Sequence, residues 1–355
     1  MRFSEEEVRA AAKTAGFEAS QIARLTDALR RLPSPVSEPV QRFDLIHLLW
    51  YAGALIVMGA MGLFSTLAFD QMGGRALTAT ALVYAGAFTA AGHSLWHRRN
   101  LRTPGGLLVT VAVAMAPLAV YGIQEASGIW GAGGDPGRYH GFFVWVKGSW
   151  IPMEIATIGA GIVALAFYPF PFIVAVIAVA LWFMSMDLAP WLFGIDALSW
   201  ALRRKVSLWF GLAVLIVAWL VDLKRPRDRD FAFWLHLCGL VAFWGGLTFT
   251  SSSSEFAKAM YCLLNVGLVA LAIFLGRRAY AVFGGMGVAL YLGHLAGEIF
   301  EDSLLFPFAL SMIGVAIIAA GLYLHRHQAS VSRWMATRLP DSLRRLRPAH
   351  AAAAI

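Results

Sequence analysis

Four ionisable side chains lie close together near the end of a chain whose apolar runs hold few others. His294, Glu298, Glu301 and Asp302 fall within GHLAGEIFEDSLLFPF, residues 293–308. On a helix, which advances about 100° per residue, the first three share one stripe and the fourth lies beside it. An imidazole beside carboxylates can bind a divalent cation or run acid–base chemistry. This segment is therefore the first candidate for a polar site, and its alternative is a helix end that emerges into water.

Two further polar groups lie in the turn-rich stretch GGDPGRYHG, residues 133–141, inside the longest loop between apolar runs. Asp135 and His140 could face a ligand from this loop, although a plain polar loop has the same composition. Glu154 lies near the start of an apolar run, and Asn265 lies deep within another. A hydrogen bond between helices would account for Asn265. We regard these four residues as weaker site candidates.

Three histidines, His47, His93 and His236, lie toward corresponding ends of three apolar runs. Their imidazoles could bind a metal ion if those helices pack together. Histidines at a membrane interface, or histidines satisfied by local hydrogen bonds, would have the same positions. The sequence leaves the metal content open.

Motifs of catalysis and nucleotide binding do not occur in the sequence. It has no Walker loop, no GxGxxG after a strand, no HExxH, no GxSxG and no paired CxxC. We predict no cofactor and expect a protein without catalytic chemistry. Cys238 and Cys262 lie in apolar runs, which predicts free, buried thiols.

Charged residues avoid the centres of the apolar runs. An ion-coupled transporter normally holds a titratable group at mid-depth, so this distribution disfavours that class. A channel, or a carrier of a neutral or lipidic solute, stays open. The charged residues that do occur inside runs lie within about one turn of an end; they are Glu154, Asp187, Asp222, Glu255 and Lys258.

The composition indicates what surrounds these residues. Of 355 residues, 59% are hydrophobic and 14% charged, and the mean hydropathy is +0.66. Soluble domains carry about 25% charged residues, so the composition predicts an all-α polytopic membrane helix bundle whose main partner is the lipid bilayer. The net charge of +8 comes from basic residues scattered between apolar runs, which is typical of membrane loops and not of a nucleic-acid interface.

Ten apolar runs approach the roughly 20 residues that a membrane helix requires. The fourth and fifth are separated only by YPFP, where Pro169 and Pro171 forbid one continuous helix. Small residues four positions after Gly86 and Gly293 predict close helix contacts there. The predicted spans are 45–69, 75–97, 104–124, 150–169, 171–187, 206–222, 231–250, 255–275, 279–298 and 304–325.

Basic residues predict the orientation of these spans. The loops at 97–102, 224–230 and 276–278 are rich in Arg and Lys, as is the C-terminal tail. The positive-inside rule therefore places both termini in the cytoplasm. The RRK at 203–205 falls on the other side, so either the rule is overridden there or the region 171–222 divides differently.

Two terminal regions flank the multi-pass region, which covers 43–326. Residues 1–42 predict a cytoplasmic helical hairpin and linker that lies on the membrane surface or binds a protein partner. The beginning of the chain lacks the apolar core of a cleaved signal peptide, so we expect the N-terminus to be kept. Residues 327–355 form a basic amphipathic tail suited to anionic lipids.

The order of parts resembles bacterial inner-membrane protein families that carry a domain of unknown function. The resemblance rests on LLWYAGALIVMGAMGLF at 48–64 and on the late segment from YLGHLAGEIFEDSLLFPF to HRH, residues 291–327. It implies a multi-pass protein of the bacterial inner membrane. These families have no established activity, so the resemblance assigns no functional residue.

Three functions remain after these observations. The first is a non-catalytic scaffold, assembly factor or permease-like component of the membrane. The second is a membrane enzyme or a cation-binding protein with a site at the outer face around His294 and Glu298. The third is a transporter or channel for a neutral or lipidic solute.

Overall fold

The computed structural model describes residues 16–18, 20–24, 45–130, 150–193, 200–224, 230–249 and 254–300, with isolated residues elsewhere. The chain divides into two units, Met1–Leu49 and Trp50–Ile355. The described part of the first unit includes a helical turn at 20–24 and the beginning of α3. Most of the predicted hairpin at 1–42 and of the tail at 327–355 lies outside the described residues.

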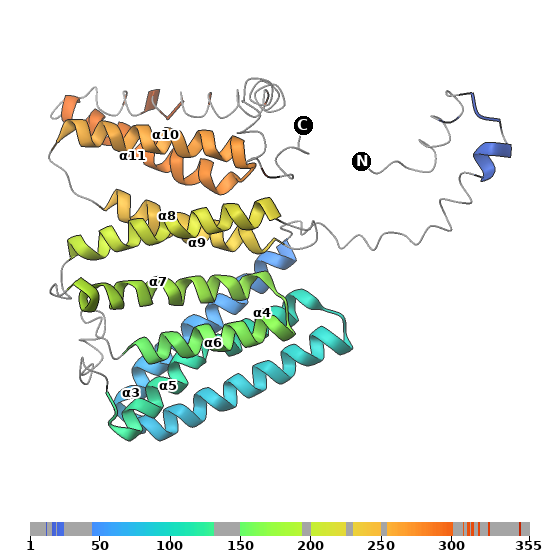
Figure 1. Cartoon of the computed structure of the whole chain (residues 1–355), viewed down its shortest axis with the longest axis vertical. Helices are drawn as coiled ribbons and strands as arrows, with labels where there is room; N and C mark the ends of the chain where they lie inside the picture. The colour runs from blue at the N-terminus through green and yellow to red at the C-terminus, as the bar shows by residue number, and fades with distance from the viewer. Residues whose placement is uncertain are drawn as a thin grey trace. The chain divides into compact units, whose positions relative to one another are not determined.

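The protein is all-helical throughout the described ranges, which contain no strand. The elements are α3 (Leu45–His93), the π-helix η1 (Ser94–Arg98), α4 (Arg102–Ala114), α5 (Ala116–Ser127), α6 (Ile151–Phe167), α7 (Pro171–Phe193), α8 (Trp200–Lys224), α9 (Phe231–Thr248), α10 (Glu255–Leu275) and α11 (Arg278–Phe300) (Figure 1).

Within the described ranges, five helical segments are long and apolar enough to cross a membrane. They are Arg102–Ser127, Pro171–Ala189, Trp200–Lys224, Phe231–Thr248 and Glu255–Leu275. Many large apolar side chains point outward from the helices; Ile56, Val83 and Trp209, for example, are each at least 66% exposed. An outward apolar surface of this extent fits a lipid environment and not water. The first nine predicted spans lie on described helices, whereas 304–325 lies mostly outside the described residues.

Glycine and proline mark the breaks between the helices. Gly73 lies within α3 with φ of 67°, a conformation that glycine adopts without steric cost, and it separates the first two predicted spans. The third predicted span consists of α4 and α5, which meet at Met115 because Pro117 in the first turn of α5 cannot continue α4. The YPFP segment forms a short turn between α6 and α7, as predicted.

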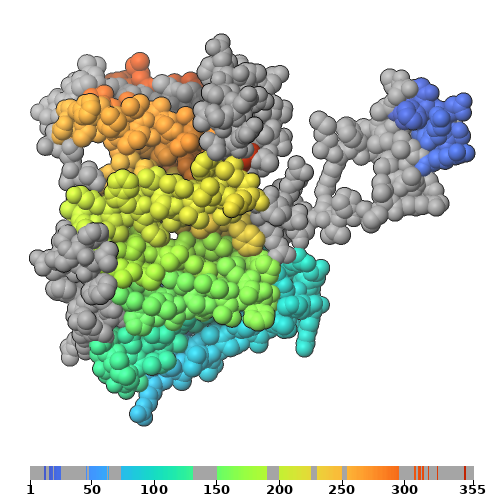
Figure 2. Space-filling view, in the orientation of Figure 1, coloured from blue at the N-terminus to red at the C-terminus, as the bar shows by residue number. Residues whose placement is uncertain are grey.

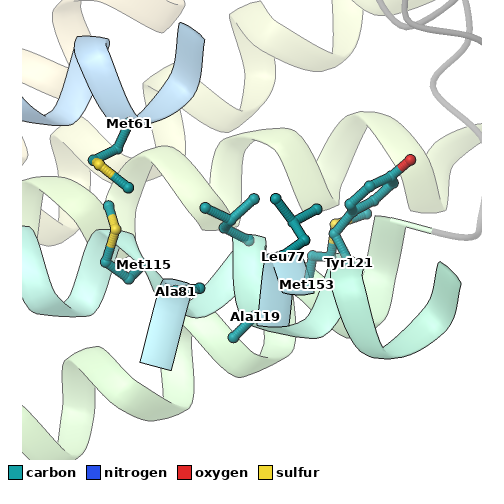
Figure 3. Packing of buried hydrophobic residues seen from close by; sticks show 8 residues of the cluster. Met61, Leu77, Ala81, Met115, Ala119, Tyr121 and Met153 are labelled. Atoms are coloured by element: carbon teal, nitrogen blue, oxygen red, sulfur yellow. The ribbon is translucent and has the colours of Figure 1, made fainter. Parts of the chain in front are cut away.

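The helices of the second unit pack mainly with their sequence neighbours. α8 packs along α9, α10 along α11 and α6 along α7, and α9 also contacts α11 (Figure 1). Side chains of α6 to α9 fill the space between the ribbons (Figure 2). One apolar cluster joins α3, α5 and α6 through Leu77, Tyr121 and Met153 (Figure 3). Another joins α8, α9 and α10 through Leu215, Leu240 and Leu268.

The predicted close contacts at Gly86 and Gly293 are wrong within the described residues, because a Cβ added at either position meets open space. Close approaches occur at other glycines. Gly211 on α8 lies against the backbone of α9, and Gly287 on α11 lies against the side chain of Asn265 on α10. Small-residue spacing marks a surface that allows approach, but it does not identify which helix face meets a neighbour.

Candidate functional site

A buried ionic network lies where α8, α9, α10 and α11 come together at one end. Its first member is Asp222 in the last turn of α8, which is only 3% exposed. An isolated carboxylate at such a position would be strongly unfavourable, so its partners decide whether it is tolerated. Its partners come from α9 and from the turn between α10 and α11.

Arg277 is the central cation of the network. Its Nη2 donates to Asp222 Oδ1 at 2.7 Å, and its Nε donates to Asp222 Oδ2 at 3.1 Å. On its other side, Nη1 and Nη2 donate to Asp230 Oδ2 and Oδ1 at 2.7 and 2.9 Å. One guanidinium thus binds two carboxylates in two-point contacts, a geometry that the planar fork of arginine allows and lysine does not.

The turn between α10 and α11 positions Arg277. Gly276 adopts a left-handed conformation with φ of 67°, and the Arg277 backbone N–H donates to Ala272 O at 3.0 Å. This glycine-based helix end directs the next residue back across the bundle. Asp230 has a second role, because its Oδ1 accepts from Phe233 N at 2.9 Å and caps α9.

His236 and Tyr280 complete the network on its inner side. His236 Nε2 faces Asp222 Oδ2 at 2.9 Å, and its Nδ1 faces the Tyr280 hydroxyl at 2.7 Å. Because a carboxylate only accepts, Nε2 carries a hydrogen in this arrangement. His236 is 1% exposed and Tyr280 is 3% exposed, so these contacts are closed off from solvent.

Burial and hydrogen bonding act in opposite directions on Arg277. Burial opposes the positive charge, but the hydrogen bonds to Asp230 and Asp222 outweigh it and raise the pKa of Arg277 above its ordinary value. The guanidinium therefore stays charged at any physiological pH. These contacts join the α8–α9 pair to the α10–α11 pair, so the network acts as a clamp between the two pairs.

A second group of charges lies at the other end of α8. Glu154 in the first turn of α6 and Asp187 on α7 interact electrostatically, and Arg203 near the start of α8 acts on Asp187. Nearby, Trp182 Nε1 donates to Ser207 Oγ at 3.1 Å, and Ser207 Oγ donates to Ala242 O at 2.8 Å. These last two bonds fasten α7, α8 and α9 to one another.

The polar group at mid-depth has the role predicted for it. Asn265 is fully buried; its Oδ1 accepts from Trp244 Nε1 on α9 at 3.0 Å, and its Nδ2 donates to Tyr261 O at 2.8 Å. The hydrogen bond between helices is thus confirmed. Cys238 and Cys262 are both free, as predicted, although both are partly exposed in the structure.

The predicted outer site is only partly within the described residues. His294 lies on α11, half-buried and within electrostatic range of Glu255 at the start of α10. Glu298 lies on the same helix, but its side chain is outside the description. Glu301, Asp302, Asp135 and His140 are outside it entirely, so a site formed by these residues stays a prediction.

The histidines have different partners from those a metal site would need. His93 Nδ1 lies 2.8 Å from the Tyr168 hydroxyl, and its ring lies 4.4 Å from that of His97. His236 belongs to the ionic network. The side chain of His47 is not among those that the structure describes. Among described residues, no three His, Cys, Asp or Glu side chains are grouped to bind a metal ion.

Sequence reasoning missed the network itself, although it noted Asp222 and His236 as polar groups near helix ends. The sequence analysis considered Arg277 only as part of the basic loop at 276–278. Two signals could have joined them: an acid, a base and a histidine all fall at the same end of neighbouring spans, and Gly276 precedes the arginine. What the sequence does not supply is the packing of one helix pair on the next.

Comparisons with known proteins add no assignment. No family model matches the chain, and neither a curated protein nor a solved structure matches it. The resemblance to families with a domain of unknown function therefore has no family match to support it, and function must be argued from the geometry alone.

Proposed function

We propose that this chain is a multi-pass membrane protein of the non-catalytic scaffold or assembly class. In this proposal about ten helices cross the bacterial inner membrane, and the buried ionic network fixes two of its helix pairs together. The observation that carries it is that Asp222 and Arg277 are held by two-point contacts on buried side chains from different helix pairs. Such contacts favour a fixed arrangement of helices over a reactive site.

The arrangement of loops supports the proposed orientation. The network brings the loops at 224–230 and 276–278 to the same end of the bundle. The loop at 97–102 lies toward that end as well, because Trp96 packs near Phe170 and the neighbouring Phe172 packs on Trp234 at the start of α9. Three basic loops at one end favour the cytoplasmic side for that end.

The basic residues at 203–205 lie at the opposite end, and two of them, Arg203 and Arg204, have local partners. Arg204 Nη1 donates to Phe249 O at 2.8 Å. Arg203 lies over the Trp200 ring and interacts electrostatically with Asp187. Contacts of Arg203 and Arg204 within the bundle would allow them to lie on the outer side against the general rule. This favours a local override over a different division of 171–222.

Labelling of single cysteines tests the topology. In a chain with Cys238 and Cys262 replaced by alanine, a cysteine at Lys224 should react with an impermeant reagent only from the cytoplasmic side. A cysteine at Ser254 should react only from the outer side. Reaction of both positions from the same side would overturn the proposed arrangement.

Partner capture tests the scaffold role. The full chain and a chain lacking residues 1–42 are purified from the native membrane under the same mild conditions. We expect a defined partner with the full chain and its loss without residues 1–42. A monodisperse protein that purifies alone and conducts a solute in liposomes would replace the scaffold proposal with a transporter.

A further inference from the structure

Glu154 and Asp187 form a carboxyl pair that the clamp does not use. They lie on the antiparallel helices α6 and α7, and they are only 6% and 5% exposed. All four carboxyl oxygens are buried and have no hydrogen-bond partner. Such groups are rare, because burying an unpaired carboxylate costs far more than burying a neutral one.

Among the described residues, the charges around the pair do not balance. Asp187 acts on Glu154, and Arg203 of α8 acts on Asp187 without a hydrogen bond to either of its oxygens. Two carboxylates and one guanidinium leave one negative charge in excess. Two buried carboxylates that interact electrostatically favour uptake of a single positive charge.

No other described charge is placed to supply that balance. On neighbouring helices, Glu125 of α5 and Arg75 of α3 are exposed. Arg102 of α4 lies at the far end of the bundle, one turn from the contact of Gly106 with Phe170. His236 of α9 is bound within the network.

We propose that Glu154 and Asp187 together bind one monovalent cation, either a proton or a sodium ion. A proton would be held by one carboxyl and shared with the other, whereas sodium would take the carboxyl oxygens directly. A divalent ion is the poorer fit, because the two carboxylates and Arg203 leave only one negative charge to balance it. The described residues supply no third His, Cys, Asp or Glu to the pair.

The position of the pair gives this binding a structural consequence. Its members lie on α6 and α7, and Asp187 interacts electrostatically with Arg203 at the start of α8. Ser207, one turn further along α8, forms the bonds that fasten α7, α8 and α9. Binding of the cation removes the repulsion between α6 and α7. The proposal goes beyond the scaffold role and does not depend on it.

Proton binding is tested by thermal unfolding of the full chain in detergent with choline as the only cation. Because the folded protein holds a proton that the unfolded chain releases, the stability should fall as the pH rises from 6 to 9. We expect the melting temperature to fall by about 2–4 °C over this range. Glu154→Gln and Asp187→Asn should each flatten this dependence, whereas Glu255→Gln, which changes an exposed carboxylate, should keep it.

Sodium binding is tested by adding sodium chloride at constant ionic strength. If sodium is the cation, it should raise the melting temperature at pH 9 and release up to one proton per chain into a weakly buffered solution at neutral pH. If the pH dependence is present without a sodium effect, the cation is the proton. Should neither variant fold, the wild-type readings still decide, because an absence of both pH dependence and sodium effect overturns the proposal. An unchanged pH dependence in folded Asp187→Asn overturns it as well.

Discussion

Each end of α8 belongs to a group of two carboxyls and an arginine, but only the carboxyls at the last turn are hydrogen-bonded. At its last turn, Asp222 forms an ion pair with Arg277 and a hydrogen bond with His236. Arg277 in turn binds the carboxylate of Asp230, which is 43% exposed. Near its first turn, Arg203 faces a carboxyl pair with no hydrogen-bond partner. Arg203 and Asp222 are about 28 Å apart at about 1.5 Å per residue, close to the hydrocarbon thickness of a bilayer of about 30 Å. One helix therefore carries a hydrogen-bonded cluster at one end and a carboxyl pair without hydrogen-bond partners at the other.

The difference shows what buried charge can do. A cluster whose donors and acceptors are matched resists any change of helix packing, because a break leaves an uncompensated charge in a low dielectric. A carboxyl pair without hydrogen-bond partners can instead take up a cation from the solution. The first type suits a clamp, and the second suits a site that responds to an ion.

The largest expected effect comes from removing the central cation of the clamp. Arg277→Met leaves Asp222 buried without its main partner, and we expect a loss of about 3–5 kcal/mol of unfolding free energy. Arg278→Met changes the adjacent, exposed arginine and should have almost no effect. Unfolding of both variants in mixed detergent measures the difference.

A second substitution separates charge from packing in the same variant. Adding Asp222→Asn to Arg277→Met removes the orphaned charge, so part of the lost stability should return. Equal losses in Arg277→Met and Arg278→Met, or no recovery in the double variant, would show that the network is not a clamp.

The middle of the bundle gives the next effect. A Cβ at Gly287 would overlap the Asn265 side chain, whereas a Cβ at Gly285 meets open space. We expect Gly287→Ala to cost about 1–3 kcal/mol through overpacking and loss of the Asn265 bond to Trp244. Gly285→Ala should be neutral or slightly stabilising. Thermal unfolding of the pair of variants tests this, and similar values for both would contradict the contact between α10 and α11.

These contacts mark how far the sequence alone could predict the molecule. Apolar runs located most of the helices, and the YPFP segment located the break between α6 and α7, because length, hydropathy and backbone restriction act locally. The bond of Asn265 was predictable too, since a buried amide requires a partner.

The candidate site was less predictable, for physical reasons that differ between its parts. Arg277 and Asp222 are distant in sequence, and only the packing of one helix pair on the next brings them together. Both members of the carboxyl pair were recognised as polar groups near helix ends, but that position indicates contact with water. Their burial follows from the covering helices, which no local pattern encodes.

The inner side of the clamp predicts a smaller effect. Tyr280→Phe removes only the hydroxyl that faces His236, while Asp222 keeps Arg277, so we expect a loss of about 0.5–1.5 kcal/mol. Tyr291→Phe, a matched change on the same helix α11, should cost less because Tyr291 is only half-buried. The two melting temperatures measure the difference, and a larger cost for Tyr291→Phe would remove Tyr280 from the clamp.

The smallest effect tests whether distance or burial decides the strength of these ion pairs. Lys258 Nζ lies 2.6 Å from Glu255 Oε1, slightly closer than Arg277 Nη2 lies to Asp222 Oδ1, yet the Glu255 side chain is 66% exposed. Water and salt screen such a pair, and holding two long side chains together opposes the attraction. Lys258→Ala should therefore leave the melting temperature unchanged within error at any salt concentration, whereas Arg277→Met should stay destabilising even at high salt. If the two substitutions were equally costly, the contrast between an exposed pair and a buried network would fail, and the separation of the atoms alone would account for their strength.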